Sequence, residues 1–170
     1  MDPHLKCLQD EVSASIQGLS TKELSWHRPD KWCIAEILEH LYLTYTGTTK
    51  GFSRLLASGK AQANVPTLRQ HMRAFVVTRA AYFPPGVKSP PLAMPRGLPS
   101  EKAISEIILK IAEMDGMMSR CAAKFGADTK LLDHPVIGPF SVSQWRKFHL
   151  VHGRHHLKQI RRLRSQAQKS

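Results

Sequence analysis

The sequence predicts an all-α protein, a four-helix bundle in which a long Pro-rich crossover joins the second and third helices. Apolar residues recur at helical spacing in four long segments, and segments rich in Pro and Gly separate them. Sustained period-two alternation is missing, so no strands are predicted. A chain of 170 residues is the size of one compact domain, which we expect to span residues 1–170.

The composition is that of a folded protein. Apolar residues make up 42% and charged residues 22% of the chain, which argues against disorder. No run of about 18 apolar residues occurs, so no membrane contact is expected, and the segment MDPHLKCLQDEV lacks the apolar stretch of a secretory signal. Cys7, Cys33 and Cys121 are odd in number and form no CxxC pair. They indicate reduced thiols, packed as small apolar side chains in a cytoplasmic protein.

The formal net charge of +12 raises the question of a nucleic-acid partner. A nucleic-acid surface usually combines a basic patch with exposed aromatic residues or a reading helix. The basic residues near the C-terminus have no aromatic residue beyond Phe148. They fit a solvated helix end, where cations face the negative pole of the helix dipole. Nucleic acid is therefore the less favoured partner, and a steep loss of duplex affinity with salt would be its signature.

Two amphipathic helices are expected in the N-terminal part. The first covers residues 3–18 and stops at Gly18, and the second covers residues 33–56, with Gly59 just beyond its end. The segment LSTKELSWHRPDKW is expected to be a linker between them. The apolar faces of the two helices consist of Leu5, Leu8, Val12 and Ile16, and of Ile34, Ile37, Leu38, Leu41 and Tyr45.

Two further long helices are expected in the C-terminal half. One begins after Pro99 with Ser100 as its N-cap and fades near Gly126, and the other covers residues 141–164. Between the second and third helices, residues 67–82 predict a shorter helix, whereas FPPGVKSPPLAMPRGLPS is too rich in Pro and Gly to be regular. Such a long connection usually has a function or is disordered, and we expect it to drape over one end of the bundle and cover a pocket.

Three histidines on two of these helices point to one metal site. His152 and His156 are four residues apart, so they lie on the same side of the fourth helix and can reach one ion. His40 lies beside the apolar face of the second helix. Alone it would be interpreted as a core residue, but two neighbouring imidazoles are costly to bury without partners. Three imidazole ligands leave a coordination position open, as in catalytic zinc sites, and they suit zinc or nickel.

Other residues are candidates for supporting roles. Glu36, one turn before His40, has the carboxylate that often orients a ligand histidine, or it is a surface residue. His149 lies close enough in angle to join or support the site. His134 belongs to the loop before the fourth helix, and we expect His155 to point away. No general base and no Gly-rich cofactor loop is identified, so the catalytic residues stay unassigned.

The residues around these histidines resemble the DinB-like superfamily. The resemblance rests on WCIAEILEHL (32–41), HPVIGPF (134–140), Trp145 and FHLVHGRHHLKQI (148–160), while residues 59–100 contribute little. It implies an up-up-down-down-like bundle with a divalent-metal site, in which His40, His152 and His156 are the ligands. It further implies zinc or nickel as the metal, and a homodimer. Characterised relatives include transferases and isomerases that act with small-molecule thiols.

The expected function is that of a divalent-metal-dependent enzyme acting on a small molecule. Water at the open coordination position would be activated for hydrolysis, whereas a thiol would be deprotonated for transfer. The resemblance favours transfer involving a low-molecular-weight thiol. Two other classes stay open: a non-catalytic metal or small-ligand binding bundle and, less favoured, a basic nucleic-acid-binding protein.

Overall fold

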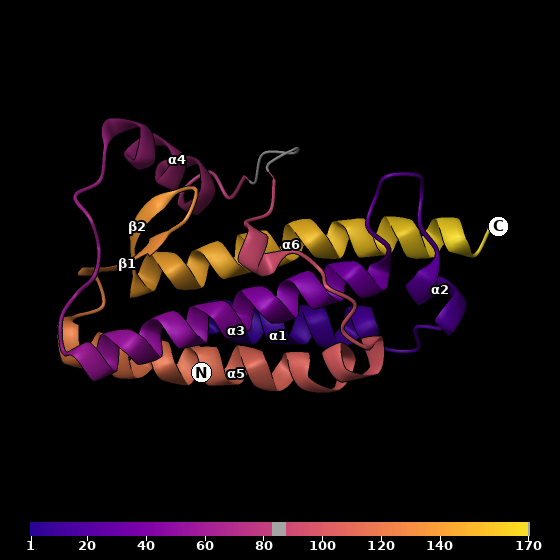
Figure 1. The fold of residues 1–170 in the computed structure, drawn as a ribbon, viewed down its shortest axis with the longest axis horizontal. Helices are drawn as coiled ribbons and strands as arrows, with labels where there is room; N and C mark the ends of the chain where they lie inside the picture. The colour runs from indigo at the N-terminus through magenta and orange to yellow at the C-terminus, as the bar shows by residue number, and fades with distance from the viewer. Residues whose placement is uncertain (83–87, 170) are drawn as a thin grey trace.

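The computed structural model describes residues 1–82 and 88–169, and it is predominantly helical, as the sequence predicts (Figure 1). Four long helices pack against one another, α3 along α5 and α1 along α6, and α6 also touches α3 and α5. Within the described ranges, no helix has both the length and the apolar character needed to cross a bilayer. The long helices are α1 (Pro3–Ile16), α3 (Ile34–Ser58), α5 (Ser100–Phe125) and α6 (Val142–Ala167).

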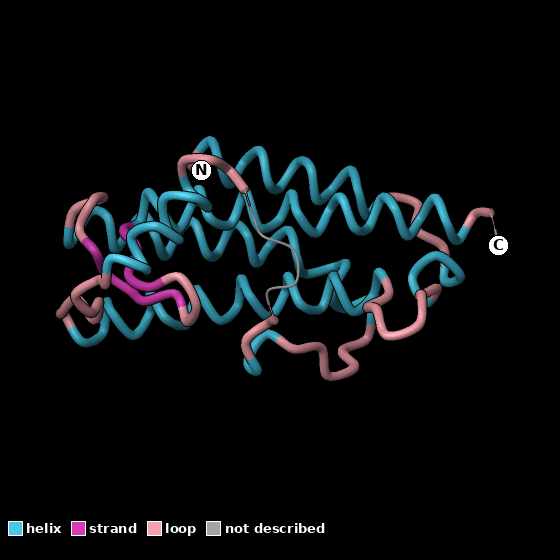
Figure 2. Tube along the Cα trace, turned by 90° about the horizontal axis from the view of Figure 1, so that it is seen from above, coloured by secondary structure: helices cyan, strands magenta, loops and turns pink. Residues whose placement is uncertain are grey.

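Shorter elements lie at the two ends of the long helices. Helix α4 and a two-stranded hairpin lie together at one end, and α2 lies at the other, in both views (Figures 1 and 2). A single 3-10 turn, η1, lies between them, over the middle of the long helices (Figure 1). The bounds are α2 (Thr21–Ser25), α4 (Leu68–Thr78), η1 (Pro91–Ala93), β1 (Lys130–His134) and β2 (Gly138–Ser141).

Local sequence signals set where the long helices begin and end. The Ser141 hydroxyl accepts the backbone N–H of Gln144 at 3.3 Å, and the Gln144 side chain accepts the backbone N–H of Ser141 at 3.2 Å. This capping box starts α6 at Val142, one residue after the predicted start. Helix α3 ends at Gly59, whose φ of 68° is left-handed and suits glycine. Helix α5 begins one residue earlier than expected, because Pro99 and not Ser100 is the N-cap.

The prediction that the chain has no strands is wrong. β1 pairs with β2 in antiparallel orientation, with Leu132 opposite Phe140 and His134 opposite Gly138. The hairpin escapes pattern analysis because its strands have only 5 and 4 residues, and all of β2 is buried, so no polar alternation appears. The expected linker also contains α2, which the capping box of Ser20 and Glu23 begins.

The Pro-rich part of the crossover is irregular over residues 88–99, apart from η1, and α4 precedes it. Of the segment predicted to be irregular, residues 83–87 lie outside the described residues. The helix expected over residues 67–82 is shorter, since α4 ends at Thr78. Glu39 ties the returning chain to α3, because its carboxylate accepts the backbone N–H groups of Arg96 at 2.7 Å and Gly97 at 3.1 Å. The returning chain is therefore held against the N-terminal part of α3, where Glu39 lies.

Gly153 allows α1 and α6 to pack closely. A Cβ atom at this position would lie 2.3 Å from Cδ1 of Leu8, which is fully buried. We expect Gly153→Ala to lower the free energy of unfolding by about 1–3 kcal/mol, because Leu8 must move within a packed core. Gly116→Ala on α5 is the matched control, since nothing lies within 4 Å of its added Cβ. Thermal unfolding should separate the two variants, and equal melting temperatures would contradict this account of the packing.

Candidate metal centre

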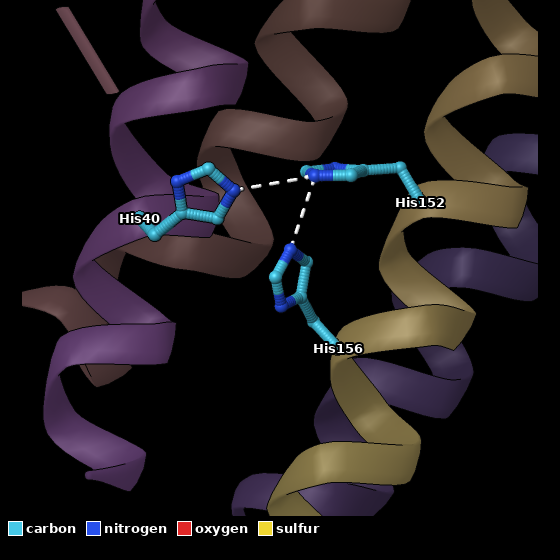
Figure 3. Close-up of side chains that lie close together, drawn as sticks. All are labelled: His40, His152 and His156. Atoms are coloured by element: carbon cyan, nitrogen blue, oxygen red, sulfur yellow. Dashed lines mark hydrogen bonds between the residues drawn. The ribbon is translucent and has the colours of Figure 1, made fainter. Parts of the chain in front are cut away.

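Three buried histidines converge between α3 and α6. His40 comes from α3, and His152 and His156 come from consecutive turns of α6 (Figure 3). Nε2 of His152 lies 3.2 Å from Nε2 of His40 and 3.1 Å from Nε2 of His156. One nitrogen of each residue lies within 4.8 Å of the others, and among the described residues these three form the only such group of potential metal ligands.

The outer nitrogen of His40 is held by the crossover. Its Nδ1 lies 2.8 Å from the backbone carbonyl oxygen of Ala93, and the hydroxyl of Ser89 lies 3.3 Å from the same nitrogen. A carbonyl oxygen can only accept, so Nδ1 carries the proton of the neutral ring. Nε2 of His40 therefore directs a lone pair toward His152.

The outer nitrogen of His156 is held from its own helix. Its Nδ1 lies 2.8 Å from Oε1 of Gln159, while the amide nitrogen of Gln159 lies 3.2 Å from Nε2 of His155. With this amide orientation Gln159 accepts from His156, so the proton of His156 is on Nδ1. Nε2 of His156 directs a second lone pair toward His152.

With these tautomers, lone pairs on the facing Nε2 atoms repel each other, and a cation between them would remove the repulsion. Neutral His152 has at most one proton on Nε2, and this proton can point toward His40 or toward His156 but not toward both. At least one of the two short contacts therefore joins two lone pairs. A divalent ion at the centre of the three nitrogens would replace this repulsion with coordination.

Burial keeps all three rings in the form that binds a metal. The pKa of His40 is lowered by loss of solvent, and that of His156 is lowered to about 3, mainly by burial and further by His40. The pKa of His152 lies well below its ordinary value, because the ring is buried and because His156 and His40 are close. Neutral imidazole is the metal-binding species, so no proton has to be displaced near pH 7.

Aromatic rings fix the orientation of two of the histidines. Phe148 stacks on His152 with ring centroids 5.3 Å apart and an interplanar angle of 11°. Trp32 packs against His40 with centroids 5.2 Å apart. The imidazoles are therefore held by packing as well as by hydrogen bonds.

The histidines open onto a cavity of about 340 Å³. A cavity of this size suits a small molecule. The Pro-rich crossover covers a pocket, as expected, since residues 88–90 and 92–93 line the cavity, and residues 132–136 of the hairpin line it as well. Side chains of α3 complete the wall with Leu43, Thr44, Thr48 and Arg54.

The other candidate residues lie outside the three-histidine group. The carboxylate of Glu36 accepts the backbone N–H of Cys33 at 2.8 Å and so caps α3. His149 is fully buried and packs against Trp145 and Tyr45, with ring centroids 5.6 Å away in each case. His155 contacts the amide of Gln159.

Sequence reasoning did not identify the groups that orient the ligand candidates. The carbonyl of Ala93 belongs to the backbone and leaves no signature in residue types. Gln159 could have been found, because it follows His156 by three residues and therefore lies on the same helix face. Glu39, which ties the crossover to α3, has 3% of its surface exposed, and its neighbours along the chain gave no reason to expect burial.

Comparison with known families places the three histidines within a family match. A family model described as a protein of unknown function (DUF1569) matches residues 4–163, a range that includes all three histidines and the crossover. No curated protein and no solved structure gives a significant match.

Proposed function

We propose that this chain, which belongs to the DUF1569 family of proteins of unknown function, is a divalent-metal-dependent enzyme that acts on a small molecule. The observation that carries the proposal is the convergence of three neutral imidazoles at the wall of a cavity of about 340 Å³. Structural zinc sites are closed by four protein ligands. Here no cysteine or carboxylate from the described residues joins the three histidines, so one position is left for a ligand from the cavity.

The nitrogen spacing fits a transition-metal ion. Zinc–imidazole bonds of about 2.0–2.1 Å in a tetrahedral site place neighbouring nitrogens roughly 3.3 Å apart. The observed separations of 3.2 Å and 3.1 Å are close to this value. Both of these separations involve Nε2 of His152, and one nitrogen of each of the three residues lies within 4.8 Å of the others, which is close enough for one ion to bridge them. Three imidazoles favour zinc or nickel.

Thiol transfer is the reaction class that we place first, with hydrolysis second. A divalent ion supplies Lewis acidity, which lowers the pKa of a thiol or water that it binds. The lining carboxylate of Asp133 already accepts the backbone N–H of Asn64 at 3.1 Å, so it is not a free base. A nucleophile with a low pKa of its own is then favoured, and a thiol at about 8.5 meets this need better than water at about 15.7. The resemblance to the DinB-like superfamily supports the same choice.

Metal content followed by turnover tests the proposal. Protein made without an affinity tag is expected to bind about one zinc or nickel ion per chain, as a single three-histidine site requires. Loaded protein should then accelerate the reaction of a small thiol with a chromogenic aryl halide, and chelator treatment should abolish the acceleration. Hydrolysis of a nitrophenyl ester would indicate the second reaction class. Stoichiometric metal with no turnover in either assay would indicate a binding protein, and absence of metal would overturn the proposal.

Gln159 is expected to tune metal affinity through His156. Replacing it with leucine removes the acceptor 2.8 Å from Nδ1 of His156, so the ring loses the group that sets its tautomer. We expect the metal affinity of Gln159→Leu to fall about 10- to 100-fold. Gln159→Glu keeps an acceptor at the same position and should retain the affinity. Competition with a metal chelator measures both constants, and equal affinities for the two variants would argue against this role.

A further inference from the structure

His134 has one ring nitrogen fixed by the turn that follows it. Its Nδ1 lies 3.2 Å from the backbone nitrogens of both Val136 and Ile137. Backbone N–H groups can only donate, so Nδ1 is the acceptor and the neutral ring carries its proton on Nε2. The connection between β1 and β2 therefore sets the tautomer of this histidine.

The ring of His134 shares an aromatic wall with the candidate metal centre. It packs edge-on against Phe148 with centroids 4.6 Å apart, and Phe148 stacks on His152. His134 and His152 thus contact the same phenyl ring from different elements, and both line the cavity. Burial lowers the pKa of His134 to about 4, so the ring is neutral near pH 7 and keeps its Nε2 proton.

The other polar groups of the cavity wall are complementary to an anion. Arg54 and Lys88 bring positive charge to the wall. Its carboxylate, from Asp133, is engaged by the backbone N–H and the side-chain amide of Asn64. Within the described part of the chain, the wall therefore offers cations and an oriented N–H donor, and its carboxylate is already occupied.

We propose that His134 is a fixed hydrogen-bond donor that positions a carboxylate-bearing small molecule at the open side of the three-histidine site. The Nε2 proton of His134 is donated to a carboxylate oxygen, and the basic side chains attract the ligand to the cavity. No proton has to be transferred. The proposal rests on the proposed metal-dependent function and names the class of ligand that this function would use.

Two amide variants separate donation to the ligand from support of the turn. The side-chain oxygen of His134→Asn can replace Nδ1 as acceptor for the turn, but its side chain is too short to replace Nε2. The amide nitrogen of His134→Gln lies as many bonds from Cβ as Nε2 does, so it restores the donor. We expect acetate to bind cobalt-loaded His134→Asn about 10- to 100-fold more weakly than the wild type, and the glutamine variant to retain most of the affinity.

The visible spectrum of the cobalt-loaded protein reports acetate binding, and elemental analysis confirms equal cobalt content. Equal acetate affinity in wild type and His134→Asn would overturn the proposal, as would a loss seen only in His134→Gln, which indicates a role in the turn alone. A nitrogen-15 spectrum of metal-free protein with the His134 proton on Nδ1 would also overturn it. Failure of the wild type itself to bind cobalt would refute the metal site first, and the ligand role with it.

Discussion

Replacement of His152 with alanine is expected to abolish metal binding while the helices stay folded. His152 takes part in both short contacts of the cluster, at 3.2 Å to His40 and 3.1 Å to His156. Its loss leaves only two imidazoles, His40 and His156, to hold an ion. We expect the metal affinity to fall by more than about 100-fold, beyond the loss caused by removing an outer hydrogen-bond partner. Metal-dependent activity should disappear with it.

Elemental analysis and circular dichroism together test this result. The variant should retain the helical signal of the wild type, because removing one of three facing imidazoles also relieves their lone-pair repulsion. His71→Ala is the control, since His71 is exposed on α4 and lies outside the cluster. If His152→Ala contained as much metal as His71→Ala, the ligand assignment would be wrong.

Replacement of His149 with phenylalanine is expected to stabilise the metal-free protein in mild acid. His149 is fully buried, and neither of its ring nitrogens has a hydrogen-bond partner in the described part of the chain. Leaving a buried polar group unsatisfied costs about 1–3 kcal/mol. Phenylalanine suits the aromatic surroundings, where Trp145 stacks on the ring and Phe148 packs edge-on at 5.1 Å.

The pH dependence provides the sharper test of His149. Burial lowers its pKa in the folded protein to about 3, against an ordinary value of 6.5. As the pH falls below 6.5, the unfolded chain takes up a proton at this residue and the folded protein does not. Protonation of His149 therefore leaves the free energy of unfolding unchanged above pH 6.5. Between pH 6.5 and about 3 it lowers this free energy by about 1.4 kcal/mol per pH unit. The phenylalanine variant has no proton to take up at this position. The difference in free energy of unfolding between His149→Phe and the wild type should therefore widen by about 2 kcal/mol between pH 7 and pH 5.

Urea unfolding at several pH values, with a chelator present, measures this gap. His71→Gln should run parallel to the wild type, because His71 is exposed on α4. A gap between wild type and His149→Phe that stayed constant from pH 7 to pH 5 would show that His149 does not resist protonation in the folded state.

Helix periodicity made much of the fold predictable. The second helix was expected over residues 33–56, and α3 covers Ile34–Ser58. The fourth was expected to begin at Ser141, which is the N-cap of α6. The hairpin was missed because β2 is short and buried along its whole length, so it lacks the alternation that identifies a strand. Strand formation there depends on the partner strand and on the helices around it.

The candidate site was predictable where its geometry is local. His152 and His156 face the same direction because the α-helix has 3.6 residues per turn. Gln159 belongs to the same local pattern. His134, by contrast, is predicted from the sequence to lie in a loop. Only its position at the end of β1 shows that its Nδ1 accepts from the turn and that the ring lines the cavity.

The sequence by itself determined the four long amphipathic helices and the pair of histidines on one face of α6, because both depend on spacing within a single helix. Only the tertiary structure decided that His40 meets this pair, and that the carbonyl of Ala93, 53 residues further along the chain, sets the His40 tautomer. The physical reason is that contacts between distant segments depend on how the helices pack and where the crossover lies. A backbone carbonyl, present in every residue, leaves no mark in the pattern of side chains.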